Sequence, residues 1–420
     1  MVNKTVLGNG VRVVTEKVAS VHSVSIGIWV KSGSRHEREG ENGLAHFIEH
    51  MLFKGTAKHT AHEIAKIIDS VGGVINAFTT KEYTCFYIKF LSQHLRLATD
   101  LLCNIFFDSL FKQEEIEKER NVIIQEINMV RDIPDDYIQD LFNQAYFKGH
   151  PLGYNVLGEL ETVQRFGKND IVNFTGREYF IPERIIISAT GNIEHQSLLG
   201  LIGKYFEHLD GSTSEPVRNS FLPERNVSFH FRDLEQVHVC LGTTGLSQVD
   251  PGRHALYVLN AILGGSMSSR LFQEIRENHG LAYSIYSYVV SFYDIGLFGI
   301  YMGVVRETVK EALDIILREL RILQEKKIDD TELGNAKEQI KGNMLLALES
   351  TDNRMSRLAK CEMYYNEHVP VEEILQSIDE VTSEAIQDLA RSLFRDEYFT
   401  YTFLGPVKEK NIPQDMLKLQ

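Results

Sequence analysis

Cysteine and proline are both scarce in this chain of 420 residues, which contains four cysteines and nine prolines. The cysteines are far apart and form no C-x-x-C pair, which argues against a disulfide framework or a thiolate metal site. With 43% hydrophobic and 24% charged residues, the chain is neither collagen-like nor disordered. The composition is that of an ordinary packed protein.

Long hydrophobic runs are also missing. The longest, Val24 to Val30, is far shorter than the ~20 residues that a membrane-spanning helix needs. The first residues carry no apolar stretch typical of a signal peptide. We therefore expect no membrane association and a cytoplasmic location.

Positive charge is in deficit. The 44 lysines and arginines face 58 aspartates and glutamates, for a formal net charge of -14. Binding to nucleic acid depends on clustered basic residues that neutralise phosphates. We therefore expect no nucleic-acid partner.

The order of the expected elements indicates two domains. Residues 210–225 are polar, contain two prolines and show no periodicity, as is typical of a linker. After the linker the order of strands, helix, strand pair, two long helices and final strand repeats. We predict two similar α+β domains, 1–209 and 226–420. Two unrelated α+β domains are the alternative.

The strongest chemical signal is Ala45-His46-Phe47-Ile48-Glu49-His50, within a helix expected from about residue 42 to 54. On a helix, residues four apart lie one above the other, so His46 and His50 can both face one metal ion. Glu49 lies on the same side, within reach of a metal-bound water. The alternative is a pair of histidines satisfied within the core.

A catalytic zinc site needs a third protein ligand from another rigid element. The helix expected at 113–131 carries Glu119 and Glu126, which are seven residues apart and share one face. Apolar neighbours (Val122, Ile123 and Ile127) predict that Glu126 is in a buried part of this helix. A buried carboxylate needs a partner, and a metal cation would serve.

H-F-I-E-H followed by E-R-N-V-I-I-Q-E-I strongly resembles the inverted zinc motif of the pitrilysin/insulinase metallopeptidases. GLAHFIEHMLFKGT, INAFTTKEYTCFY, HPLGYNVLG and LGGSMSSRLFQEIRENHGLAYS extend the resemblance over most of the chain. It implies an α+β fold of two homologous domains that form a clamshell. Each would be a roughly six-stranded antiparallel sheet with helices packed on one face.

The resemblance also implies roles for residues of the first half. His46, His50 and Glu126 match the zinc ligands, and Glu49 matches the general base. Glu119 matches a glutamate that orients a ligand histidine.

Further roles concern the substrate. Arg276 and Tyr283 match a pair that reaches the substrate from the second half, although a surface arginine and a half-buried tyrosine are the alternative. Asn76, Ala77 and Phe78 match the edge strand along which the peptide lies.

The expected function is a zinc-dependent endopeptidase that cuts short or unfolded peptides in a chamber between the two halves, with one zinc ion per chain. The resemblance implies a second chain as partner, so we expect a homodimer. The second half carries no comparable ligand set. The resemblance implies that its role is to complete the substrate chamber. The alternatives are a non-catalytic subunit or binding protein with a structural zinc, and a zinc hydrolase of non-peptide substrates.

Overall fold

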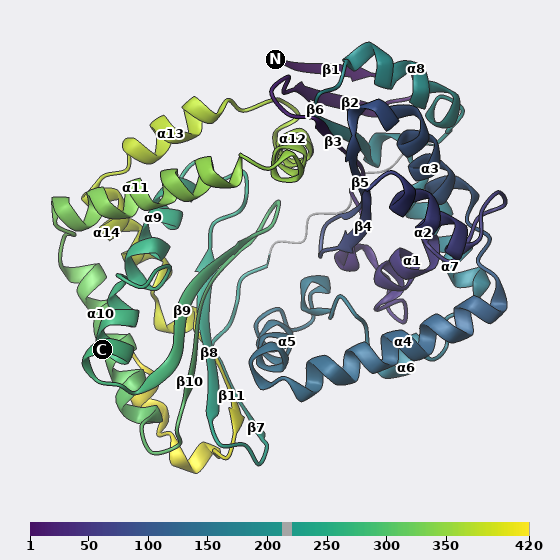
Figure 1. The fold of residues 1–420 in the computed structure, drawn as a ribbon. Coiled ribbons are helices and arrows are strands. Elements are labelled where there is room, and N and C mark those ends of the chain that lie inside the picture. The colour runs from purple at the N-terminus through teal and green to yellow at the C-terminus, as the bar shows by residue number, and fades with distance from the viewer. Residues whose placement is uncertain (212–220, 420) are drawn as a thin grey trace. The chain divides into compact units, whose positions relative to one another are not determined.

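The computed structural model describes residues 1–211 and 221–419, and its element order is that of an α+β protein (Figure 1). Two sheets, of six and five strands, are each packed with helices. The predicted fold class, with two similar halves, is thereby confirmed. The predicted linker, 210–225, falls largely on residues 212–220, which lie outside the described part of the chain.

The described residues form two compact units, and neither is continuous in sequence. Unit 1 comprises residues 1–129, 154–211 and 347–368. Unit 2 comprises residues 130–153, 221–346 and 369–419. The expected continuous domains, 1–209 and 226–420, remain a prediction about the chain's domain boundaries.

The first sheet has the strand order β1-β2-β6-β3-β5-β4. Its strands β2 and β6 are parallel, and its other neighbours are antiparallel. The sheet is therefore mixed, whereas a fully antiparallel sheet was expected. The strands are β1 (Val2–Val6), β2 (Arg12–Lys17), β3 (Ser23–Val30), β4 (Val74–Thr79), β5 (Thr84–Leu91) and β6 (Ile185–Gly191).

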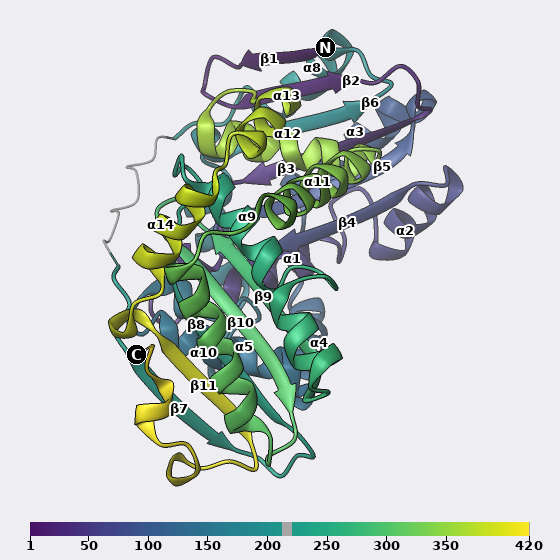
Figure 2. The same cartoon turned by 90° about the vertical axis from the view of Figure 1, so that its left-hand side faces the viewer.

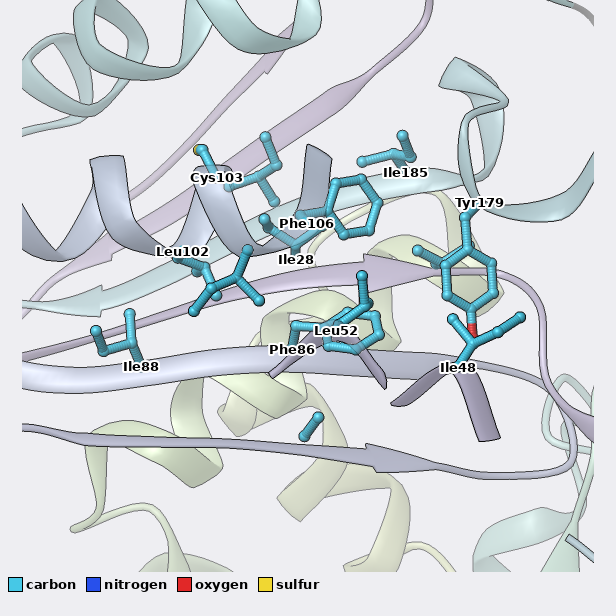
Figure 3. Close-up of a cluster of buried hydrophobic side chains, with 14 of the residues drawn as sticks. Ile28, Ile48, Leu52, Phe86, Ile88, Leu102, Cys103, Phe106, Tyr179 and Ile185 are labelled. Atoms are coloured by element: carbon cyan, nitrogen blue, oxygen red, sulfur yellow. The ribbon is translucent and has the colours of Figure 1, made fainter. Parts of the chain in front are cut away.

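Side chains alternate across the first sheet, so each face has its own hydrophobic cluster. Ile28 belongs to a cluster that also contains Ile48 of α1 and Phe106 of α3 (Figure 3). Trp29, the next residue, faces the other side and packs with Met355 of α12. The helices of this unit are α1 (Leu44–Leu52), α2 (Ala61–Ser70), α3 (Leu95–Asp108), most of α4 (Gln113–Asp132), α6 (Leu160–Val163), α7 (Lys168–Phe174), α8 (His195–Phe206) and α12 (Thr351–Tyr365).

The second sheet has the order β7-β11-β8-β10-β9, with β7 and β11 parallel. Helix α10 packs on one face (Figure 2) and α5 on the other. The strands are β7 (Asn226–Phe231), β8 (Val237–Gly245), β9 (Ala282–Ser291), β10 (Gly296–Val304) and β11 (Thr400–Gly405). The helices are α5 (Pro134–Tyr146), α9 (Arg253–Leu263), α10 (Val309–Glu325), α11 (Asp330–Ala347), α13 (Val371–Asp379) and α14 (Ser383–Leu393).

The two sheets follow the same plan. If β7 is matched with β2, β11 corresponds to β6, β8 to β3, β10 to β5 and β9 to β4, and only β1 has no counterpart. Each sheet also has a helix from the other half of the sequence: α12 packs on the first sheet and α5 on the second. The two halves therefore exchange equivalent helices.

Helix α12 is held on the first sheet by ion pairs at its margins as well as by apolar contacts. Arg354 Nη1 lies 2.7 Å from Glu16 Oε1 of β2. Glu362 Oε1 lies 2.7 Å from Lys4 Nζ of β1. Together with the buried side chains Met355 and Leu358, these contacts make α12 an integral part of unit 1.

The structure bears on two expectations from the sequence, which concern disulfide bonds and membrane-spanning helices. All four cysteines are buried and free of disulfide bonds. Among residues 1–211 and 221–419, no helix has the length and apolar character needed to cross a bilayer.

Candidate active site

Helix α1 presents one face to the core and one to the site. Its apolar residues Phe47 and Ile48 are fully buried against the sheet and neighbouring helices. His46 and His50 are one turn apart on the remaining side, with their ring centroids 4.7 Å apart. The i, i+4 spacing therefore brings the two imidazoles together, as the sequence indicated.

The first turn of α1 is fixed by a buried carboxylate that sequence reasoning did not single out. Glu37 Oε1 accepts a hydrogen bond from Ala45 N at 2.9 Å, and its Oε2 accepts one from Gly43 N at 3.0 Å. The Asn42 amide donates a third at 3.2 Å. Glu37 thus satisfies backbone donors at the helix start that would otherwise be unpaired.

A close glycine contact braces the same turn. Gly43 has a φ of +95°, and a Cβ there would lie 2.6 Å from the Cα of Gly158. The side chain of Asn42 donates to Asn155 O at 2.8 Å. Residues of the HPLGYNVLG segment therefore pack directly against the beginning of α1.

Helix α4 brings the two glutamates to the histidines. Ile116, Ile123 and Ile127 are buried and set the orientation of the helix. The expectation that Glu126 lies in a buried stretch is only half right. Its side chain is 33% exposed, and Val122, one turn earlier, is 44% exposed. Val122 and Glu126 are four residues apart and lie one above the other on the partly exposed side of the helix.

His46, His50 and Glu126 converge on one point. The Nε2 atoms of the two histidines lie 3.8 Å and 3.7 Å from Glu126 Oε2, and one ligand atom from each of the three residues lies within 4.8 Å of the others. No other group of three such residues occurs in 1–211 and 221–419.

These distances fit a metal ion. They are too long for hydrogen bonds, so the three groups converge without bonding directly to one another. Two ligands of a tetrahedral zinc ion, each bonded at ~2.0–2.1 Å, lie about 3.4 Å apart. Two imidazoles and one carboxylate also form a donor set typical of catalytic zinc sites.

The surroundings keep both imidazoles ready to bind a metal. Burial, assisted by the charge of His50, lowers the pKa of His46 to about 3, which keeps this ring neutral near pH 7. His50 uses Nδ1 to hydrogen-bond Glu119 Oε2 at 3.1 Å, which leaves Nε2 directed at Glu126. Lys54 Nζ lies 2.7 Å from Glu119 Oε1. Burial alone would raise the pKa of Glu119, but the bonds from His50 and Lys54 lower it.

Glu49 is held beside the three candidate metal ligands. The hydroxyl of Thr79, at the end of β4, donates to Glu49 Oε2 at 2.6 Å. Burial raises the pKa of Glu49, and the bond from Thr79 opposes part of that shift. Glu49 is therefore a partly buried carboxyl group with one oxygen already engaged.

Strand β4 carries Asn76, Ala77 and Phe78 and is an edge strand of the first sheet. Asn76 is exposed and Ala77 is buried in the core beneath α1. Phe78 packs edge-to-face on Trp29, with ring centroids 5.6 Å apart. One side of β4 is thus unpaired within the described sheet.

Arg276 and Tyr283 lie together in unit 2. The Arg276 guanidinium is 4.6 Å from the centre of the Tyr283 ring, and Tyr283 is 76% exposed at the start of the edge strand β9. Tyr283 is therefore far more exposed than a half-buried structural tyrosine.

Comparison with known proteins assigns the family. Residues 12–160 match the model of "Insulinase (Peptidase family M16)", and residues 174–340 match that of "Peptidase M16 inactive domain". A Bacillus subtilis protein named "uncharacterized zinc protease" is 42% identical over 400 residues, 95% of this chain and 97% of the relative. A Streptomyces coelicolor protein of the same description is 40% identical and covers 97% of this chain and 90% of its own length. The chain therefore belongs to the M16 peptidase family.

Solved structures share the fold. A protease from Helicobacter pylori aligns with a TM-score of 0.88 at 24% identity, over 96% of this chain and 99% of its own. A Pseudomonas fluorescens structure described as "peptidase M16 inactive domain" aligns with a TM-score of 0.90 at 17% identity, covering 97% and 98%. Proteins with much lower sequence identity therefore share the fold of this chain.

Proposed function

We propose that this protein is a zinc-dependent endopeptidase that hydrolyses short or unfolded peptides. The observation that supports this most directly is the convergence of His46, His50 and Glu126 beside the carboxylate of Glu49. The names of the Bacillus and Streptomyces relatives agree with a zinc protease.

His46, His50 and Glu126 would hold one zinc ion per chain. When bound there, zinc would lower the pKa of a water molecule to about 7 and polarise the scissile carbonyl. Glu119 keeps His50 in the tautomer and orientation in which Nε2 is the free nitrogen. The neutral form of His46 avoids competition between a proton and the metal.

Glu49 acts as the general base. Its free oxygen takes a proton from the attacking water, and the same carboxyl group then delivers a proton to the leaving amine. The burial that raises its pKa makes the carboxylate a stronger base than an exposed glutamate. Arg276 and the hydroxyl of Tyr283 would contact the substrate, and Tyr283 would donate a hydrogen bond to the oxyanion.

The peptide binds by adding a strand to the free edge of β4, along Asn76, Ala77 and Phe78. Strand addition uses mainly backbone hydrogen bonds, so it tolerates many sequences but requires an extended segment. Folded proteins cannot offer such a segment easily, which restricts the substrates to short or unfolded chains. The predicted homodimer and cytoplasmic location stay predictions.

A structural role for the metal is the weaker alternative. A structural zinc site normally has four protein ligands, whereas three groups converge in the described residues. Three protein ligands leave the fourth coordination position to water, as a catalytic zinc site requires.

The test is Glu49→Gln, which is nearly isosteric but cannot accept a proton. We expect elemental analysis to find about one zinc per chain in wild type and in Glu49→Gln. Hydrolysis of an unfolded peptide should fall by several orders of magnitude in the variant. His46→Ala, as the matched control, should lose both metal and activity. A Glu49→Gln enzyme of wild-type activity would contradict the proposed base, and full metal in His46→Ala would contradict the site.

A further inference from the structure

Thr79, the last residue of β4, hydrogen-bonds the side chain of Glu49. Its Oγ1 donates a 2.6 Å hydrogen bond to Oε2 of Glu49, thirty residues earlier in the chain. Among the described residues, no other hydrogen bond to the Glu49 side chain is found, so Thr79 alone engages this carboxylate.

The pleat of the strand directs Thr79 to this position. Ala77 faces the core beneath α1, and Phe78 faces the opposite side with Trp29. Since side chains two residues apart lie on the same face of a strand, Thr79 shares the side of Ala77 and meets α1. Its place is fixed by pairing with Thr84 of β5.

We propose that Thr79 is a positioning residue for the reaction: its hydroxyl holds one oxygen of Glu49 so that the other faces the attacking water. This inference rests on the proposed function of Glu49 as general base. A carboxylate on a flexible glutamate side chain can rotate among several staggered conformers, and a short hydrogen bond to one oxygen selects one of them.

The same bond connects the base to the strand on which we propose that the peptide adds. Thr79 is the next residue after the Asn76–Phe78 stretch, so a peptide paired with β4 stabilises the backbone that carries the Thr79 hydroxyl. Orientation of the base is thereby coupled to occupancy of the strand edge.

The experiment compares Thr79→Val with Thr79→Ser. Valine keeps the branched shape and strand preference of threonine but has no hydroxyl, whereas serine keeps the hydroxyl. For Thr79→Val we expect kcat on an unfolded peptide to fall roughly 10- to 100-fold, the loss that corresponds to one hydrogen bond to a charged group. KM, zinc content and melting temperature should stay close to wild type, and Thr79→Ser should recover most of kcat.

Thr190→Val is the matched control. Thr190 is a fully buried threonine of β6 in the same sheet, and its hydroxyl has no hydrogen-bond partner among the described residues. The same chemical change there should leave kcat unaltered. If Thr190→Val lowers kcat as much as Thr79→Val, the effect belongs to the sheet and the proposal for Thr79 is overturned.

Two further measurements separate this inference from the proposed function. In a Glu49→Gln background, Thr79→Val should cause little additional loss, because the two residues act through one group. Crystal structures of the metal-free proteins should show one Glu49 conformer in wild type and a displaced or multiple conformer in Thr79→Val. If Glu49→Gln inactivates the enzyme but Thr79→Val keeps wild-type kcat and the single conformer, the Thr79 inference alone fails. An active Glu49→Gln enzyme removes the base, and the Thr79 role falls with it.

Discussion

Stacking of Arg276 on Tyr283 allows the role of one hydroxyl to be tested apart from that of its ring. The guanidinium lies over the face of the aromatic ring, an attraction that phenylalanine preserves. Tyr283→Phe therefore removes the hydroxyl and leaves the packing of Arg276 intact.

We expect Tyr283→Phe to lower kcat roughly 10²- to 10³-fold, as for the loss of one oxyanion donor, with zinc content unchanged. Tyr398→Phe is a suitable control, because Tyr398 is likewise stacked with an arginine, Arg395, at 5.1 Å. Steady-state kinetics on one unfolded peptide measure both variants. Equal activity of Tyr283→Phe and Tyr398→Phe would show that the Tyr283 hydroxyl has no part in the reaction.

At this scale the sequence indicates local relations far better than distant ones. The convergence of His46 and His50 follows from their four-residue spacing on one helix. The sequence also indicated Glu126 as the third ligand, from its position on the face of a second helix. Thr79 and Glu37 gave no comparable signal. Each contacts α1 from a different part of the chain, and threonine and glutamate are such frequent residue types that their presence alone indicates no special role. The alternation of side chains along β4 predicts that Thr79 lies on the same face as Ala77. It does not predict that Thr79 lies next to Glu49.

The element on which the site depends most is α1, whose beginning is held by Glu37. This side chain is 4% exposed and offers an acceptor oxygen to Gly43 and to Ala45. Glutamine has only one acceptor oxygen, so Glu37→Gln leaves a buried N–H facing an amide group. An unsatisfied buried donor costs about 1–3 kcal/mol.

We therefore expect Glu37→Gln to lower the free energy of unfolding by about 1–3 kcal/mol and to weaken metal binding, because the turn before His46 loosens. Urea denaturation and metal titration measure the two effects. The control is Glu63→Gln on α2, where an exposed glutamate accepts from Thr60 N and glutamine can replace it. A Glu37→Gln protein as stable as the Glu63→Gln protein would exclude this role for Glu37.

Most elements near the site could be predicted from periodicity. Helices were expected near 42–54 and 113–131, and α1 and α4 occupy Leu44–Leu52 and Gln113–Asp132. The exchange of α5 and α12 could not be foreseen. Helix α12 meets its sheet partly through charged residues such as Arg354 and Glu362, and no local pattern states which distant sheet a helix will cover.

Over the whole molecule, this exchange makes each unit depend on both halves of the sequence. A fragment of residues 1–209 contains His46, His50 and Glu126, the candidate metal ligands, but lacks α12. The face of the first sheet that carries Trp29, Cys85 and Ile186, all fully buried in the intact chain, would then be uncovered. Removing such side chains from water stabilises a fold by about 1.5–3 kcal/mol each.

We expect fragment 1–209 alone to unfold without a sharp transition and to bind a hydrophobic dye. Co-expression with fragment 210–420, which supplies α12 and receives α5, should restore a cooperative thermal transition. The full-length chain is the reference for both. Cooperative unfolding of 1–209 by itself, at the temperature of the full chain, would show that α12 is dispensable for unit 1.

The place of α12 in the chain also has a consequence for biosynthesis. Ribosomes add about 5–20 residues per second, so the stretch from residue 209 to Tyr365, the end of α12, takes roughly 8–30 s to make. During that interval the first sheet of the nascent chain has the apolar face that α12 covers still open. We therefore expect the newborn chain to need protection from aggregation, by a chaperone or by the ribosome surface, until α12 emerges.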